Sequence, residues 1–134
     1  MREGRGRYDA APHLRGSEAA YSFFDGIAAL DREAFYCVHL DVRHTVLSCE
    51  EVSRGTLVGS LVHPREVYKA AILANAASIV VAHNHPSGDP TPSAEDYAVT
   101  RRLRQAGDVL GIPLLDSLVI GRGTYYSLRD HGEL

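Results

Sequence analysis

Hydrophobic and polar residues recur with helical or strand periodicity over most of the chain after residue 16. Apolar residues at helical spacing follow Ser17, a residue type common at helix N-termini, and predict a helix over residues 17–30. Two aromatic and β-branched runs, at residues 34–40 and 45–52, flank the short polar segment 41–44. This arrangement predicts an antiparallel hairpin.

Further along the chain, Pro64 stands where the first turn of a helix is expected, since proline is favoured at that position. The predicted buried face of this helix comprises Val67, Ala70, Ala71, Leu73 and Ala74. The apolar run at residues 79–82 predicts a strand covered on both faces. Another helix is predicted over residues 94–110, with Tyr97, Val99, Leu103, Ala106, Val109 and Leu110 directed inward.

Residues 114–120 and 124–128 predict a second hairpin around the glycine-containing turn at 121–123. The predicted order of elements is therefore αββαβαββ. Such an order is typical of the α/β class, and we expect a three-layer single domain with a mixed β-sheet flanked by helices.

The chain of 134 residues has the length of one domain. Residues 1–15 are rich in glycine and arginine without apolar periodicity, so we expect a flexible basic N-terminal tail followed by one domain at 16–134. Hydrophobic residues make up 45% of the chain, which excludes a wholly disordered protein. No apolar run approaches the roughly 20 residues of a membrane span, and no signal peptide is evident, so the predicted location is cytoplasmic.

Charge and cysteine content narrow the function further. The net charge of −3 argues against a protein whose main role is to bind phosphate backbones. Two cysteines cannot form a disulfide framework, and we expect both to be free thiols. The predicted hairpin places Cys37 within one position of Cys49 on the opposite strand.

Candidate chemistry is concentrated where the buried strand ends. His83 and His85 follow this strand two positions apart, so both imidazoles can point to the same side. A proline-rich loop then leads to Asp96 in the first turn of the next helix. Two imidazoles and one carboxylate with an open fourth position match the ligand set of a catalytic zinc ion. Glu50 or Glu51, late in the first hairpin, is the candidate general base.

Each of these residues also has a purely structural interpretation. Histidines at strand ends are commonly surface residues, and Ser93 with Asp96 forms a capping box that would by itself explain both side chains. The coincidence of two histidines, a serine and an aspartate at one strand end favours the metal site over this interpretation.

The motif His-Asn-His-Pro-Ser-Gly at residues 83–88, followed by Pro-Ser-Ala-Glu-Asp at 92–96, resembles the JAMM (MPN-plus) metalloprotease signature in the form carried by the RadC family. The resemblance extends over residues 17–134 and implies a JAB/MPN domain of the cytidine-deaminase-like type. It implies that His83, His85 and Asp96 bind one Zn²⁺ per chain. It also implies that Glu50 is the general base and that Ser93 supports the oxyanion.

The implied reaction is the hydrolysis of a peptide or isopeptide bond by zinc-activated water, with a peptide or protein as substrate. Two features depart from longer RadC sequences. Ser117 stands where their Asp-His pair has histidine, and we expect this chain to be a short form without their N-terminal helix-hairpin-helix.

Two other functions remain as alternatives. One is a nucleic-acid-associated role, as a metal-dependent nuclease or DNA-repair accessory factor, against which the net negative charge counts. The other is a non-catalytic MPN interaction module. A zinc deaminase is excluded because the chain has neither His-x-Glu nor Pro-Cys-x-x-Cys, and a His-Glu-x-x-His helix is absent as well. No membrane partner is expected, and the sequence does not predict the oligomeric state.

Overall fold

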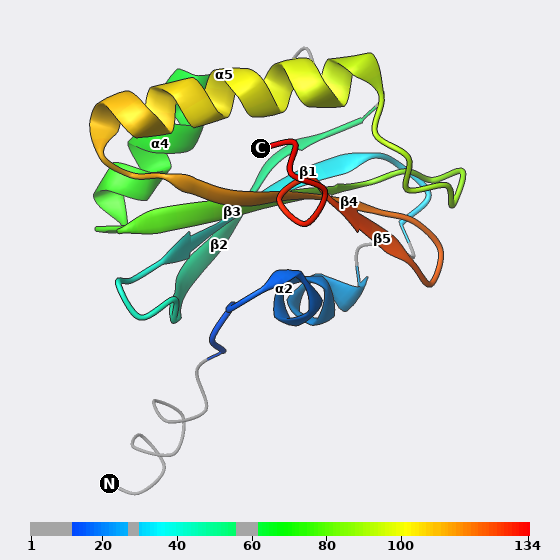
Figure 1. The fold of residues 1–134 in the computed structure, drawn as a ribbon, viewed down its shortest axis with the longest axis horizontal. Helices are drawn as coiled ribbons and strands as arrows, with labels where there is room; N and C mark the ends of the chain where they lie inside the picture. Colours follow the sequence, from blue (N-terminus) through cyan, green and yellow to red (C-terminus); the bar gives the residue numbers. More distant parts are fainter. Residues whose placement is uncertain (1–11, 27–29, 56–61) are drawn as a thin grey trace, which may run out of the picture.

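The computed structural model describes residues 12–26, 30–55 and 62–134 (Figure 1). Within these residues the chain forms α2 (Ser17–Phe23), β1 (Ala34–Leu40), β2 (Val46–Arg54), α4 (Pro64–Leu73), β3 (Ser78–Asn84), α5 (Ala94–Leu110), β4 (Leu114–Ile120) and β5 (Tyr125–Ser127). This order confirms the predicted αββαβαββ arrangement and the α/β class. Most of the predicted N-terminal tail, residues 1–11, lies outside the described residues.

One mixed sheet of five strands forms the middle layer, in the order β2-β1-β3-β4-β5. The β3–β4 pair is parallel, because α5 carries the chain back across the sheet, and the other neighbouring strands are antiparallel. Helices α4 and α5 cover one face and α2 covers the other (Figure 1). The predicted three layers and both predicted hairpins are therefore confirmed.

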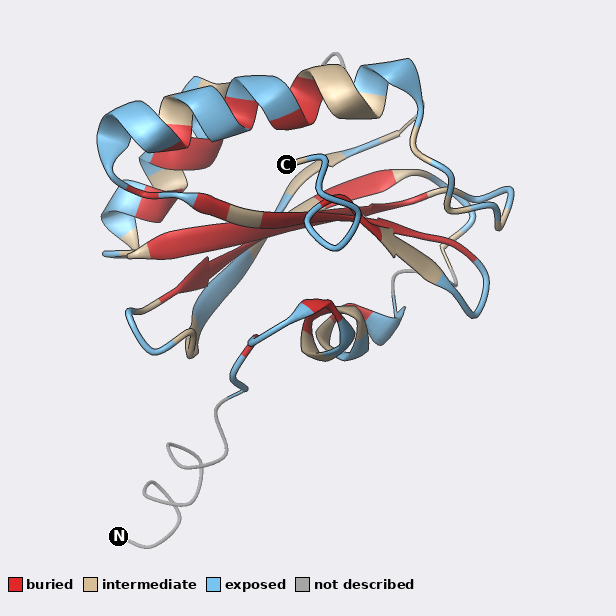
Figure 2. Cartoon of the chain, in the orientation of Figure 1, coloured by how far each residue is buried: buried red, intermediate tan, exposed pale blue. Residues whose placement is uncertain are grey.

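The core lies on both sides of the central strands. Every residue of β3 is buried, as predicted for a strand covered on both faces (Figure 2). Along β1, Phe35 and Cys37 pack on the side of α4 and α5, whereas Val38 and Leu40 pack on the side of α2. This alternation follows from the two-residue repeat of a strand.

The N-terminal part of the fold differs from the prediction. Gly16, not Ser17, is the N-cap of α2, and the helix ends at Phe23 instead of continuing to residue 30. The Ser17 hydroxyl instead contacts Tyr125 and Asp130. Leu14 is buried, so the packed domain begins earlier than residue 16.

The helices α4 and α5 begin where predicted, but their inward faces are partly different. Pro64 opens α4, and a capping box opens α5. In α4, Tyr68 is buried and its hydroxyl donates a hydrogen bond to the backbone oxygen of Leu103. Leu73 of α4, predicted to face inward, is exposed, and so are Val109 and Leu110 near the end of α5.

The two cysteines are free, as predicted. Val38 pairs with Cys49 and Cys37 pairs with Glu50, so the cysteines are one position out of register. Since neighbouring positions on a strand point to opposite faces, the two thiols face different layers. No helix among the described residues combines the length and apolar character needed to cross a membrane.

Candidate metal centre

Four side chains converge at one end of the central strands: Glu33, His83, His85 and Asp96. Each of these side chains offers one potential ligand atom, and the four atoms all lie within 4.8 Å of one another. They come from the residue before β1, the end of β3, the residue after β3 and the first turn of α5. Two imidazoles and two carboxylates are suitable donors for a divalent metal, so this cluster could hold a metal ion.

The two histidines are positioned by strand pairing. His83 is opposite Phe35 in the β1–β3 pair, and the two rings stack with their centroids 5.8 Å apart. The backbone N–H of His85 donates to the oxygen of Ile120 at 2.9 Å, which extends the attachment to β4 beyond the end of β3. Both imidazoles therefore leave a fixed backbone toward the same carboxylate, that of Asp96.

Asp96 has a structural role and a place in the cluster at the same time. Its backbone N–H donates to Ser93 Oγ at 3.1 Å, and its Oδ2 accepts from the Ser93 backbone N–H at 2.8 Å. Its Oδ1 lies 2.9 Å from His83 Nε2, and its Oδ2 lies 3.1 Å from His85 Nε2. The helix cap therefore orients the carboxylate toward both histidines, and the two interpretations drawn from sequence are compatible.

Glu33 is held in place by Asn84, which lies between the two histidines and is 1% exposed. Asn84 Oδ1 accepts from the backbone N–H of Ala34 at 2.8 Å, and its Nδ2 donates to the backbone oxygen of Arg32 at 3.0 Å. These two bonds bracket Glu33 on either side. The middle residue of the His-Asn-His motif thus fixes the segment that brings a fourth side chain to the cluster.

The cluster shifts the proton affinities of its members in different directions. Burial raises the pKa of Glu33, and the nearby His83 and His85 only partly offset this. Burial also acts to raise the pKa of Asp96, but the two imidazoles beside its carboxylate hold this pKa well below its ordinary value. The bond to Asp96 raises the pKa of His85. Asp96 therefore stays anionic more readily than Glu33, and Glu33 is the carboxylate better suited to carry a proton.

The nitrogen atoms of the histidines fit a bound metal. Both ring nitrogens of His83 are buried, and neither has a hydrogen-bond partner among the described residues, although Nε2 lies near Asp96. His85 Nδ1 lies 2.9 Å from the backbone oxygen of Asp89. A proton on this Nδ1 leaves the Nε2 lone pair directed at the cluster, which is the usual arrangement of a metal-binding histidine. An unpaired buried nitrogen is costly, and a metal ion in the cluster would satisfy His83 Nε2.

The structure places Glu50 outside this cluster and puts Glu33 there instead. Glu50 is paired with Cys37 on the edge strand β2, whereas His83 is paired with Phe35. Because β1 separates β2 from β3, the backbones of Glu50 and His83 are at least about 10 Å apart. Glu50, the residue predicted as general base, is therefore not part of this cluster, and its catalytic role stays a prediction.

Glu51, the neighbouring candidate, lies on the opposite face of β2. Its carboxylate accepts from the Tyr36 hydroxyl at 2.9 Å and pairs with Arg54 at 2.6 Å. The sequence analysis does not identify Glu33, because this residue stands just before the predicted strand at residues 34–40. The antiparallel pairing of β1 with β3 identifies it, since this pairing brings the residue before β1 next to the end of β3.

Ser93 and Ser117 have contrasting environments. Ser93 is exposed at the start of α5, where its oxygen accepts from Asp96, so its hydroxyl proton is free to donate elsewhere. Ser117 is buried on β4, and its oxygen accepts from the Thr100 hydroxyl at 3.0 Å. Ser117 therefore serves the packing of α5 on the sheet.

A cleft lies beside the cluster on the side of Glu33. It has a volume of about 540 Å³ and is lined by Asp31, Arg32, Glu33, Gly55 and Pro86. Glu33 thus lies both in the cluster and in the wall of the cleft, where a substrate could reach it.

Comparison with known proteins places this geometry in context. The family model of the RadC-like JAB domain matches residues 14–133. A UPF0758 protein of Symbiobacterium thermophilum is 55% identical over 133 residues, which cover 96% of this chain and 57% of the relative. A UPF0758 protein of Moorella thermoacetica is 51% identical over 117 residues, covering 87% of this chain and 51% of the relative. A UPF0758 protein of Thermotoga maritima is 44% identical over 121 residues, which cover 90% of this chain and 54% of the relative. The chain thus spans about half the length of these relatives.

Proposed function

Because this chain belongs to the RadC-like JAB domain family, we propose that it is a metal-dependent hydrolase of the JAMM type, acting on peptide or isopeptide bonds. The observation that carries the proposal is the convergence of Glu33 on His83, His85 and Asp96, beside an open cleft. This arrangement combines a metal-binding donor set with a carboxylate of raised pKa, the two components that metal-assisted hydrolysis requires.

In this proposal His83 Nε2, His85 Nε2 and the Asp96 carboxylate hold one Zn²⁺ ion. The neutral histidines and the anionic aspartate form a three-ligand set with a further position left for substrate or water. When bound, the ion supplies Lewis acidity toward a carbonyl oxygen and toward water. The side chains around the ion transfer the proton and stabilise the oxyanion.

Glu33 is the general base in this scheme. It accepts the proton of the attacking water and later donates it to the leaving nitrogen. Its raised pKa favours the second step, because a carboxyl group that holds its proton more tightly is present as the acid closer to neutral pH. Ser93, whose hydroxyl is exposed at the same end of α5, donates a hydrogen bond to the oxyanion that develops on the substrate.

The test compares two glutamates of the same chain. Metal content is measured by elemental analysis on wild type, His83→Ala, Asp96→Ala, Glu33→Gln and Glu50→Gln, and hydrolysis is measured on a quenched-fluorescence peptide library and on isopeptide-linked peptides. We expect about one zinc per chain in the wild type and loss of metal in the first two variants. Glu33→Gln should keep the metal and lose turnover, whereas Glu50→Gln should keep both. Loss of turnover in Glu50→Gln alone would refute the role of Glu33, and a wild type that takes up no metal would refute the function.

A further inference from the structure

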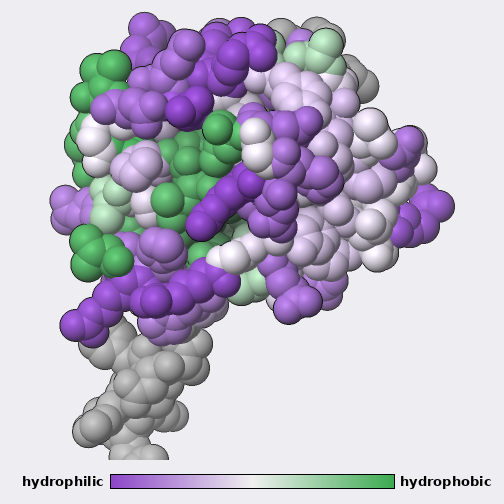
Figure 3. Space-filling model, in the orientation of Figure 1, coloured by the Kyte–Doolittle hydropathy of each residue, from purple (hydrophilic) through white to green (hydrophobic). Residues whose placement is uncertain are grey.

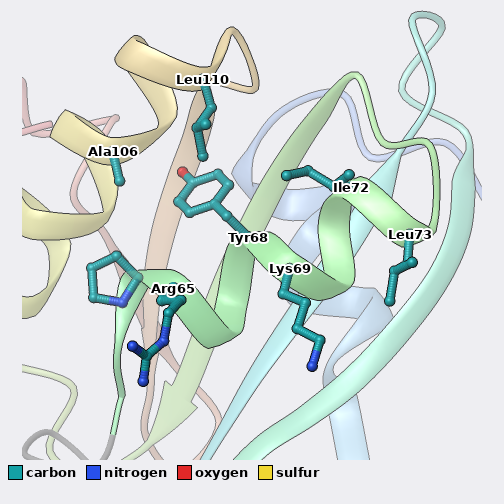
Figure 4. A pocket seen from close by; sticks show the side chains of 8 residues that line it. Arg65, Tyr68, Lys69, Ile72, Leu73, Ala106 and Leu110 are labelled. Carbon is teal, nitrogen blue, oxygen red and sulfur yellow. The ribbon is translucent and has the colours of Figure 1, made fainter.

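A hydrophobic groove separates α4 from the C-terminal half of α5, away from the metal centre (Figure 4). Its volume is about 480 Å³. Tyr68, Ile72 and Leu73 of α4 form one side, and Ala106 and Leu110 of α5 form the other. The metal centre contributes no residue to it.

The apolar walls of the groove are unusually exposed. Ile72 is 53% exposed, Leu73 76% and Leu110 48%, and Val109 next to them is 86% exposed. These are four of the six large hydrophobic side chains that the described residues expose. Figure 3 shows hydrophobic surface gathered on the side of the molecule where α4 and the end of α5 lie. Concentrated apolar surface of this kind marks an interaction site.

The rim of the groove is positively charged, although the whole chain carries a net charge of −3. Arg65 and Lys69 line it, one turn apart on α4, and none of the described residues lining it is acidic. Outside the lining, Glu66 lies 3.8 Å from Arg65, so Lys69 is the cation there without a recorded ion pair among the described residues. Arg102 stands one turn before Ala106 on α5 and adds a third cation to this side of the helix. A ligand with carboxylates beside an apolar stripe would complement this rim.

We propose that the groove binds an amphipathic helix of a partner protein, with apolar side chains seated between α4 and α5 and acidic side chains against Arg65 and Lys69. Two helices bordering an apolar trough are the usual receptor for a helix. A small molecule would need a site that buries most of its surface, which walls as exposed as Leu73 do not provide. A second copy related by a two-fold axis would bring two positive rims together.

Such a partner would leave the metal centre open. Asp96 lies in the first turn of α5 and Ala106 lies ten residues later, so the two sites are about 15 Å apart along the helix. The groove therefore suits the recruitment of a protein to the domain rather than occupation of the cleft beside Glu33. The inference does not depend on the proposed hydrolase activity.

The test uses synthetic amphipathic peptides of roughly 18 residues, about five helical turns. One peptide carries glutamate beside its leucine stripe, a second carries lysine at the same positions, and a third is the glutamate peptide interrupted by proline. Binding is measured by fluorescence anisotropy. We expect the glutamate peptide to bind at least about tenfold more tightly than either of the others. Lys69 is the only lysine of the chain, so its acetylation, followed by mass spectrometry, should slow when this peptide is bound.

Matched variants locate the binding. Leu73→Asp should lower the affinity for the glutamate peptide at least about tenfold. Val42→Asp, at a residue 83% exposed in the β1–β2 turn, should leave its affinity unchanged. Arg65→Glu combined with Lys69→Glu should reverse the preference in favour of the lysine peptide. Equal binding of both peptides, no binding of either, or equal effects of Leu73→Asp and Val42→Asp would overturn the proposal. The proposal would also be overturned if sedimentation velocity showed that the wild type is a dimer and that Leu73→Asp makes it monomeric.

Discussion

At Asn84 a single buried side chain joins two parts of the chain that lie some fifty residues apart. Asn84→Ala would leave the backbone N–H of Ala34 and the backbone oxygen of Arg32 without their partners. Each buried polar group that loses its hydrogen bond costs about 1–3 kcal/mol. We therefore expect the free energy of unfolding to fall by at least about 1 kcal/mol in Asn84→Ala, measured by urea denaturation.

Ser87→Ala is the control for Asn84→Ala, since Ser87 is an exposed residue of the same motif whose oxygen accepts only one long bond, at 3.3 Å. It should change the free energy of unfolding by no more than about 0.5 kcal/mol. Equal stability of the two variants would mean that the Asn84 hydrogen bonds contribute nothing measurable to the stability of the fold.

His39 gives a prediction about pH. It is 3% exposed, its Nδ1 lies 2.7 Å from Ser48 Oγ, and its Nε2 has no partner among the described residues. Burial lowers the pKa of His39, so the folded state binds a proton less readily than the unfolded state. Its neutral form is therefore compatible with folding above the ordinary histidine pKa of about 6.5, and stability is lost as the pH falls below that value.

The measurement compares wild type with His39→Gln by urea denaturation at about pH 7.5 and about pH 5. Glutamine does not titrate, so the wild type should lose more stability than the variant between these two values. Parallel losses in both proteins would show that His39 does not contribute to the acid sensitivity of the fold.

At the scale of elements, the loop between β3 and α5 depends on the turn between β4 and β5. The oxygen of Gly88 accepts from the backbone N–H of Arg122 at 3.0 Å. A Cβ atom at Gly121 would collide with the oxygen of Gly88 and lie 3.0 Å from Pro90 Cδ. Because this loop connects His85 to Asp96, a shift at its base would separate these two side chains of the cluster.

Gly121→Ala is therefore expected to weaken zinc retention at least about tenfold, measured by competition with a chromophoric chelator. Gly26→Ala is the matched control, since a Cβ there meets no atom within 4 Å. It should retain zinc as the wild type does. If Gly121→Ala also retains zinc fully, the close packing of the two turns is irrelevant to the metal centre.

The predictions from sequence succeeded where the information is local. The cap Ser93 and the helix behind it lie within a few residues of the histidines, and periodicity identified every described element. Glu33 was missed because its place depends on the pairing of β1 with β3, which joins residues far apart in sequence. The face of α4 was partly wrong for a related reason, since the partner that buries Tyr68 is α5.

At the scale of the molecule, the two candidate sites divide α5 between them. Its first turn carries Asp96 of the metal centre, and its last turns carry Ala106 and Leu110 of the groove. One rigid helix thus sets a constant spacing between the two. A protein held at the groove would be presented to the cleft at a fixed distance, which is how a recruitment surface can serve a hydrolase.

The metal centre also links parts of the fold that are distant in sequence, so metal binding should stabilise the whole domain. Glu33 precedes β1, His83 lies next to the end of β3 and Asp96 lies in the first turn of α5, and the unfolded chain does not hold these residues together. An ion that binds only the folded state at about 100 times its dissociation constant adds about 2.7 kcal/mol. For a domain of this size that is a rise in melting temperature of roughly 10 °C.

The comparison is thermal unfolding with added zinc and with chelator, for wild type, His83→Ala and Leu73→Asp. The wild type should show the full difference in melting temperature, and His83→Ala should show almost none. Leu73→Asp should keep the full difference, because Leu73 lies in the groove and takes no part in metal binding. A wild type that melts at the same temperature in both solutions would show that the four side chains do not bind zinc in the folded protein. A smaller difference in Leu73→Asp would instead show that the groove and the metal centre are coupled through α5.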